Sequence, residues 1–219
     1  MLAQDRTLTR GALRTPKAAA IAGLVFSILL IAIFLPLRLI VPADPREPGA
    51  WLVSHARLVG WAVNLVPFAG IAFLWFIGVL RDRLGKQEDR FFSTVFFGSG
   101  LLFLGMLLVL AAFTGGIVAA FEAQPQGMAE SATFYFARSA VYSIANIYMA
   151  KTAAVFMMTT SMVALRTGIA PRWLSIVGFM LAPLLLFGSY YFTWIFIAFP
   201  LWVMLISASI LRDKFRGLS

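Results

Sequence analysis

One lysine, Lys151, lies deep inside a long apolar stretch of the sequence. The stretch 139–165 is long and apolar enough to cross a bilayer as a helix, and Lys151 stands near its middle. A cation at that depth is costly, so by default it marks a functional site. Every Asp and Glu falls outside the apolar stretches or at their ends. The sequence therefore offers Lys151 no acidic partner within the membrane.

Other polar side chains occupy two faces of this predicted helix. Tyr148 and Thr152 share one broad face with Lys151, and Asn146 lies on roughly the opposite face. A helix that is polar on two faces is expected to be enclosed by other helices. We therefore predict a ligand-binding surface made up of Lys151, Tyr148, Thr152, Asn146 and, from another apolar stretch, Asn64. The structural alternative is that Lys151 bonds helix carbonyls and neighbouring polar side chains, or loses its proton.

A weaker candidate site involves His55, the single histidine. It lies in a polar stretch with Asp44, Glu47 and Arg57, and Glu122 begins a second polar stretch. His55 and Glu122 are therefore weak candidates for metal ligands, although no ligand spacing such as H-E-x-x-H is present. The sequence also lacks a nucleophile elbow, a Walker loop and a dinucleotide-binding loop. We expect no catalytic residue and no cofactor.

The composition indicates that these residues are positioned by helices in a membrane. Hydrophobic residues make up 61% of the chain and charged residues 12%, whereas a soluble domain is about half apolar and about a quarter charged. Long apolar stretches and 21 phenylalanines make a soluble helical core a poor alternative. The absence of cysteine excludes disulfides and cysteine-bound metals. We predict an all-α, polytopic integral membrane protein.

Six apolar stretches predict six transmembrane helices in one membrane domain, 18–211, between basic tails at 1–17 and 212–219. The predicted spans are 18–41, 59–80, 91–121, 139–165, 173–189 and 190–211. A cleaved signal peptide is the alternative for the first stretch, but its 24 apolar residues exceed the usual length of about 7–15. In the third stretch, small residues recur every four positions in two rows, one through Gly115 and one through Gly116. Such rows let another helix approach closely.

The distribution of basic residues predicts the orientation of these helices. The net charge of +9 comes from short basic clusters beside the apolar stretches, and such clusters determine topology. With the N-terminus inside, most of the 18 basic residues lie in cytoplasmic segments. We therefore expect both termini in the cytoplasm and the segments 42–58 and 122–138 outside. The same distribution argues against a nucleic-acid partner, because no long basic surface is present.

The segment 166–174, which reads RTGIAPRWL and precedes an apolar stretch, resembles a turn in uncharacterised bacterial multi-span membrane proteins of unknown function. The resemblance covers the last part of the chain. It implies a multi-pass location in the bacterial plasma membrane and supplies no activity or functional residues.

Three functional hypotheses follow from these observations. The first is a non-enzymatic protein that binds or conducts a small solute, an ion or a lipid through the polar face around Lys151. The second is a structural or regulatory membrane subunit that packs with a partner protein, and the third is a membrane enzyme acting on lipid. The expected partners are the lipid bilayer and either further copies of the chain or another membrane protein.

The predicted topology can be tested because the chain contains no cysteine. In intact cells, the variant Gln87→Cys should resist a membrane-impermeant thiol reagent, since residue 87 lies in a predicted cytoplasmic loop. The variant Glu130→Cys, in a predicted outer loop, should react. Labelling of the cysteine at residue 87 in intact cells would overturn the predicted orientation.

Overall fold

The described part of the chain is helical throughout. The computed structural model describes the backbone of residues 2–84, 90–189 and 191–216, and the side chains of 18–81, 92–189, 191–192 and 194–212. Within these ranges every regular element is a helix. The predicted all-α class is therefore confirmed.

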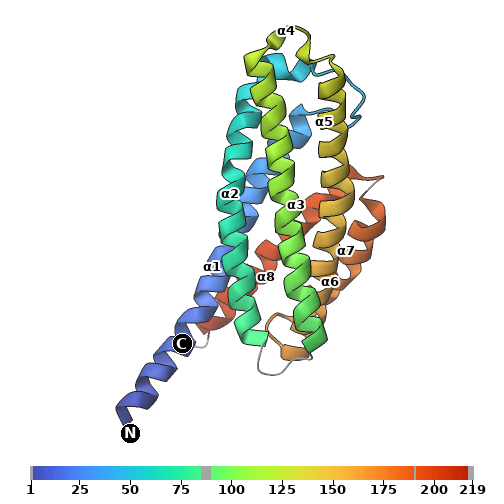
Figure 1. Ribbon diagram of the computed structural model, residues 1–219. Helices are drawn as coiled ribbons and strands as arrows, with labels where there is room; N and C mark the ends of the chain where they lie inside the picture. Colours follow the sequence, from blue (N-terminus) through green and yellow to red (C-terminus); the bar gives the residue numbers. More distant parts are fainter. Residues whose placement is uncertain (1, 85–89, 190, 217–219) are drawn as a thin grey trace.

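Long helices run up and down one bundle, and successive long helices are antiparallel (Figure 1). Their bounds are α1 Leu2–Ile40, α2 Ala50–Leu84, α3 Arg90–Ala123, α5 Ala132–Ser143, α6 Ala150–Thr167, α7 Arg172–Gly188 and α8 Ala198–Arg216. Three short elements complete the chain: the helix α4 Pro125–Met128, the π-helix η1 Ile144–Met149 and the 3₁₀-helix η2 Thr193–Ile197. Because η1 joins α5 directly to α6, these three elements form one long interrupted helix.

Five of the described helices are long and apolar enough to cross a membrane. They correspond to five of the six predicted spans, namely Ala18–Ile40, Ala50–Arg81, Phe92–Ala123, Ala132–Thr167 and Trp194–Arg212. The remaining predicted span, 173–189, is the apolar helix α7, which has only 17 residues. At 1.5 Å per residue α7 is about 26 Å long, slightly less than the hydrocarbon core of about 30 Å.

The bundle is longer on one side than on the other. Both termini lie at the lower end in Figure 1, and α4 lies at the upper end, which we call the α4 end. The turn between α7 and α8 lies only partway toward the α4 end, so α2, α3 and α5 extend beyond it. A hydrogen bond fixes this level, because Ser189 Oγ donates to the carbonyl oxygen of Asn146 at 2.7 Å.

A cluster of phenylalanines fills the centre of the bundle. Phe73 from α2 lies 4.6 Å from Phe26 of α1, 5.1 Å from Phe103 of α3 and 5.3 Å from Phe156 of α6, measured between ring centroids. Phe199 of α8 completes the cluster, with its ring centroid 5.0 Å from that of Phe103. Aromatic pairs at these distances contribute about 0.5–1.5 kcal/mol each beyond their buried area. Five helices are therefore held together by one set of ring contacts.

Glycines allow close helix contacts at two places in the core. A Cβ atom added to Gly178 of α7 would collide with Ser161 Oγ and with the Trp202 indole, and one added to Gly23 of α1 would collide with Ser207 Oγ. These glycines let α7 approach α6 and α8, and let α1 approach α8.

The two small-residue rows of α3 differ in their surroundings. The row through Gly115 faces α2, since a Cβ atom there would lie 3.5 Å from Val63 Cγ1. The expected close contact at Gly116 is wrong for the described chain, because a Cβ atom there meets nothing within 4 Å. Gly116 instead borders an open groove between α3 and α5.

The contrast between the two kinds of glycine predicts a stability difference. Gly178→Ala should destabilise the protein by about 1–3 kcal/mol, because the added methyl group overpacks the contact with Trp202. Gly116→Ala, the matched control in the middle of α3, should be neutral or stabilising, since alanine favours helix and the site is open. Thermal unfolding in detergent measures both. Equal melting temperatures for Gly178→Ala and the wild type would show that α7 does not pack this closely.

Candidate functional site

A cavity opens between α1, α3 and α5, toward the α4 end of the bundle. It holds about 620 Å³ of empty space, counted up to its open mouth. Apolar side chains form most of its walls. Its polar side chains are those of Arg38, Thr114, Arg138, Tyr142 and Asn146, with the indole of Trp51 beside them.

Arg38 reaches this cavity from the last turn of α1, where a cation interacts favourably with the helix dipole. Its Nη2 atom donates a hydrogen bond of 2.8 Å to Oδ1 of Asn146. This bond joins α1 to the interrupted helix of α5, η1 and α6 across the cavity.

Arg138 enters the cavity from α5 and is the more deeply buried of the two arginines, with 6% of its surface exposed. Its Nη2 atom donates a hydrogen bond to the carbonyl oxygen of Pro42. Arg38 and Arg138 are close enough to repel each other electrostatically. Asp44 and Glu47 in the loop after α1 attract Arg138, but both are exposed and neither forms an ion pair with it.

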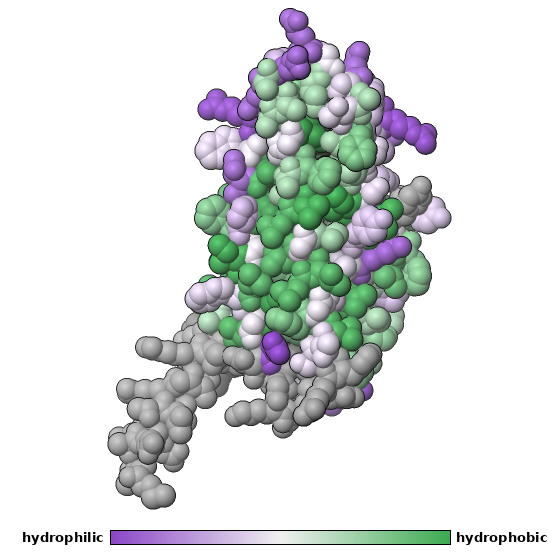
Figure 2. All heavy atoms as spheres, viewed as in Figure 1, coloured by the Kyte–Doolittle hydropathy of each residue, from purple (hydrophilic) through white to green (hydrophobic). Residues whose placement is uncertain are grey.

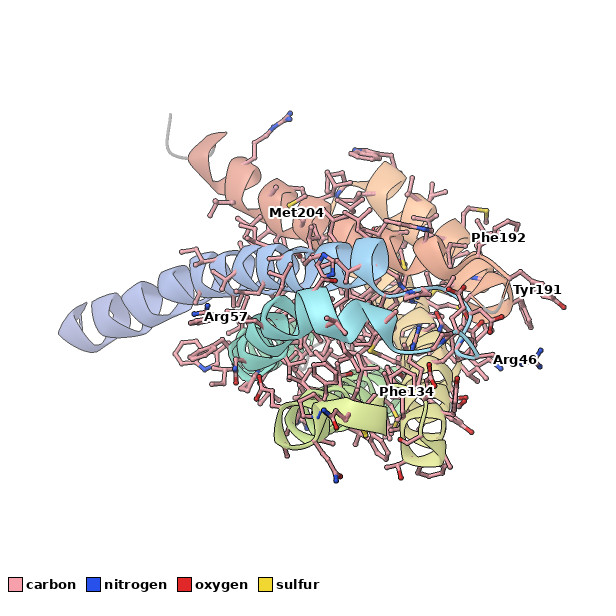
Figure 3. All side chains as sticks on the ribbon, turned by 90° about the horizontal axis from the view of Figure 1, so that it is seen from above. Arg46, Arg57, Phe134, Tyr191, Phe192 and Met204 are labelled. Atoms are coloured by element: carbon pink, nitrogen blue, oxygen red, sulfur yellow. The ribbon has the colours of Figure 1, made fainter. Side chains whose placement is uncertain are left out.

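Two other arginines near the α4 end point away from the bundle, whereas Arg138 points into it. Viewed from above the α4 end, Arg46 and Arg57 point outward on opposite sides of the bundle (Figure 3). Phe134, one turn before Arg138, is fully buried and packs with Trp51 and Leu52 in a second apolar cluster. That cluster holds α5 against the start of α2, which keeps Arg138 turned inward.

Both guanidinium groups retain donors that are not satisfied by the protein. A guanidinium carries five N–H donors, and the hydrogen bonds found use one nitrogen of each arginine. Among the described side chains, the fully enclosed polar atoms without a partner are the hydroxyls of Ser161, Ser175 and Ser207. The unpaired guanidinium nitrogens are therefore accessible from open space. The cavity therefore presents two cations, and no carboxylate is among its described lining residues.

The π-helix η1 positions Asn146 in this site. In a regular α-helix, residues 138 and 146 would point about 80° apart, and the wider π turn reduces that angle. Asn146 Nδ2 donates to the carbonyl oxygen of Tyr142 at 2.9 Å, which leaves Oδ1 directed at Arg38. Ser189 binds the Asn146 carbonyl oxygen, so the turn after α7 braces the same residue. Single π turns of this kind occur frequently at functional sites.

Of the five residues predicted to bind a ligand, Asn146 lines the cavity. Lys151 and Tyr148 are exposed on the outside of the bundle, and Thr152 Oγ1 donates to the carbonyl oxygens of Tyr148 and Met149, both at 3.0 Å. The expected enclosure is therefore right for the Asn146 face and wrong for the Lys151 face. The reason is that α3 and α7 both pack on α6 and leave the Lys151 face uncovered. A role in ligand binding for Lys151, Tyr148 and Thr152 stays a prediction.

Asn64 lies apart from Asn146, in a shallow depression that also contains Arg57 and Glu122. His55 is exposed, and its Nδ1 atom lies 2.7 Å from Ser54 Oγ. No group of three or more potential metal ligands lies together among the described residues. The structure thus does not bring His55 and Glu122 into a metal-binding cluster within that part of the chain.

Sequence reasoning missed both arginines as members of one site. Arg38 lies near the end of the predicted span 18–41, from which a long basic side chain can reach the headgroups, and Arg138 ends the predicted outer segment 122–138. Two features of the sequence could have joined them. Both lie on the same predicted side of the membrane, and neither has an acidic residue within a helical turn.

Comparison with protein-family models, with curated proteins and with solved structures gives no match, so no activity is carried over to this chain from another protein.

The Arg38–Asn146 bond predicts that Asn146 matters for stability. Asn146→Ala should cost about 1–3 kcal/mol, because Arg38 then loses the acceptor for a buried charged donor. Asn64→Ala makes the same change at an exposed site and should stay within about 0.5 kcal/mol of the wild type. Thermal unfolding in detergent compares them. Equal stability of the two variants would show that Arg38 does not depend on Asn146.

Proposed function

We propose that the chain is a six-span membrane protein of the bacterial plasma membrane, with both termini in the cytoplasm and the α4 end outside. The five long apolar helices and the shorter apolar α7 support this proposal. The green, apolar surface in Figure 2 is concentrated over the middle of the bundle, and purple, polar side chains gather at the α4 end. The basic clusters beside the helices at the opposite end agree with the positive-inside rule.

The function that this site supports best is non-enzymatic binding of an anion between Arg38 and Arg138. One observation carries the proposal: two guanidinium groups that repel each other line one cavity, and neither forms an ion pair with a carboxylate of the described residues. A buried cation without a partner is strongly unfavourable, and an anion in the cavity relieves that cost for both arginines at once. Arginine is also well suited to oxyanions, because its planar group donates two parallel hydrogen bonds.

The residues around the arginines favour binding over catalysis. The polar lining consists of Arg, Asn, Tyr, Thr and Trp side chains, with no carboxylate or imidazole to act as a general base near neutral pH. The hydroxyl of Thr114 already donates to the Leu110 carbonyl oxygen at 2.8 Å. A membrane enzyme acting on lipid is therefore less well supported than a binding protein.

Lys151 takes a different place in this proposal. It follows Asn146 by five residues, so it lies about 7.5 Å further along the helix than the level set by Ser189 and Asn146. An exposed lysine at that distance from an interface can extend its amine to the headgroups. We therefore propose that Lys151 contacts the surface of the bilayer and that the ligand occupies the arginine cavity.

The open groove beside Gly116 favours the second hypothesis, a membrane subunit that packs with a partner. Its lining includes Ala112, Gly116, Ala120 and Ala137, and small residues allow close helix approach. This role is compatible with anion binding, because the groove lies on the outer side of α3 and α5.

Anion binding can be measured by thermal unfolding of the purified protein. Phosphate or sulfate should raise the melting temperature above its value in chloride of equal ionic strength. At ligand concentrations ten times the Kd, the gain is about 1.4 kcal/mol, or several degrees for a chain of this size. Arg38→Met and Arg138→Met should each remove this gain. Lys151→Met, the matched control, should retain it.

The variants also separate the competing interpretations. Because phosphate and sulfate stabilise many proteins by exclusion from their surfaces, an equal gain in both arginine variants would refute the anion site. If Lys151→Met alone lost the rise in melting temperature, the anion would bind at the Lys151 face of the helix and not between the arginines. In Asn146→Asp, a carboxylate would lie beside Arg38 and should suppress the anion effect by supplying an internal counter-charge.

A further inference from the structure

We propose that the anion is the phosphate group of a membrane lipid, which enters the cavity sideways from the outer leaflet between α1 and η2. This inference rests on the proposed anion-binding function and adds the class of the ligand and its route. Three observations carry it: the depth of the arginines, a second opening beside Arg38, and the apolar wall of the cavity.

The depth of the site matches that of lipid headgroups. The helix α7 is about 26 Å long, so it can barely cross the hydrocarbon core, and the turn that follows it must lie at the outer interface. Tyr191, Phe192 and Trp194 at this turn are exposed, as aromatic side chains at a membrane interface are. Ser189 in the same turn binds the backbone of Asn146, and Asn146 binds Arg38. The arginine cavity is thereby placed at the level where lipid phosphates lie.

A second, smaller pocket lies next to the cavity, beside Arg38. It lies between the end of α1 and the start of α8, and its lining includes Trp194, Ile197 and Pro200. Phe34 and Arg38 line this pocket and the larger cavity alike. Arg38 is half-buried, whereas Arg138 further inside is buried. The guanidinium of Arg38 thus stands between the bilayer and the interior, where a headgroup moving sideways meets it before Arg138.

The cavity suits an amphiphile better than a free ion. Beside the arginines, its wall is formed by Phe34, Leu37, Leu110, Ile117 and Val141. Such a surface favours an acyl chain and offers nothing to a hydrated inorganic ion. The phosphate then accepts hydrogen bonds from both guanidinium groups, with the indole N–H of Trp51 and the hydroxyl of Tyr142 as further donors in the lining.

The test compares two phosphates on the delipidated, detergent-purified protein. Monododecyl phosphate should stabilise the wild type at concentrations at least about tenfold lower than inorganic phosphate, because burial of a few methylene groups strengthens binding by that factor or more. Arg138→Met should abolish both effects. Ala145→Leu fills the apolar part of the cavity and should weaken only the effect of monododecyl phosphate.

Each outcome bears on one proposal. If monododecyl phosphate and inorganic phosphate stabilised the wild type at equal concentrations, the lipid assignment would be overturned and the anion site would remain. No stabilisation by either phosphate would overturn the anion site itself. A monododecyl phosphate effect that persists in Arg138→Met would be that of a detergent and would also overturn the lipid assignment. If Ala145→Leu does not fold, Val141→Phe fills the same cavity from α5 and gives the same comparison.

Discussion

Two guanidinium groups share one cavity in this bundle, and no carboxylate is among the described residues that line it. Much of the surrounding structure serves to keep the two groups there. The end of α1 supplies Arg38, α5 supplies Arg138, and the π turn after α5 directs Asn146 toward Arg38. A pair of like charges in a largely apolar space is stable only if something outside the chain or at its surface compensates. In the proposed topology the pair lies level with the turn after α7, at the depth of the lipid phosphate groups of the outer leaflet.

The rest of the bundle provides a rigid frame for this pair. Lipid gives helices no hydrophobic reason to associate, so their contacts depend on packing and on hydrogen bonds. The phenylalanine cluster around Phe73 links α1, α2, α3, α6 and α8, and Gly178 and Gly23 permit the closest helix contacts. The second cluster, around Phe134 and Trp51, then fixes α5 against α2 near the α4 end. Arg138 is held inward by packing, although no charge in the cavity attracts it there.

The sequence was informative about helices and much less so about the site. Apolar stretches and their flanking charges predicted where the long helices lie, because lipid demands long apolar helices. They did not predict every start: α1 begins at Leu2 within the predicted tail, α2 at Ala50 and α8 at Ala198. The surroundings of Lys151 were misjudged: Lys151 lies midway along 139–165, but its side chain is exposed on the outside of the bundle. The π turn has no sequence signature, so the sequence could not predict that Asn146 faces Arg38. Arg138 was read as a loop residue because it ends the polar segment 122–138, and the packing of α5 turns it inward.

The unequal lengths of the helices have a consequence for the bilayer itself. On one side the protein offers α7, about 26 Å long, and on the other α3, about 51 Å long. If the chain spans a bilayer as proposed, a membrane of uniform thickness cannot match both sides, so it should thin beside α7 and thicken, or let the helices emerge, beside α3. The lipid annulus around the protein would then be sloped, and acyl chains near η2 would be compressed relative to bulk lipid. Release of that elastic strain would favour departure of a lipid from the annulus at the side where the pocket beside Arg38 lies.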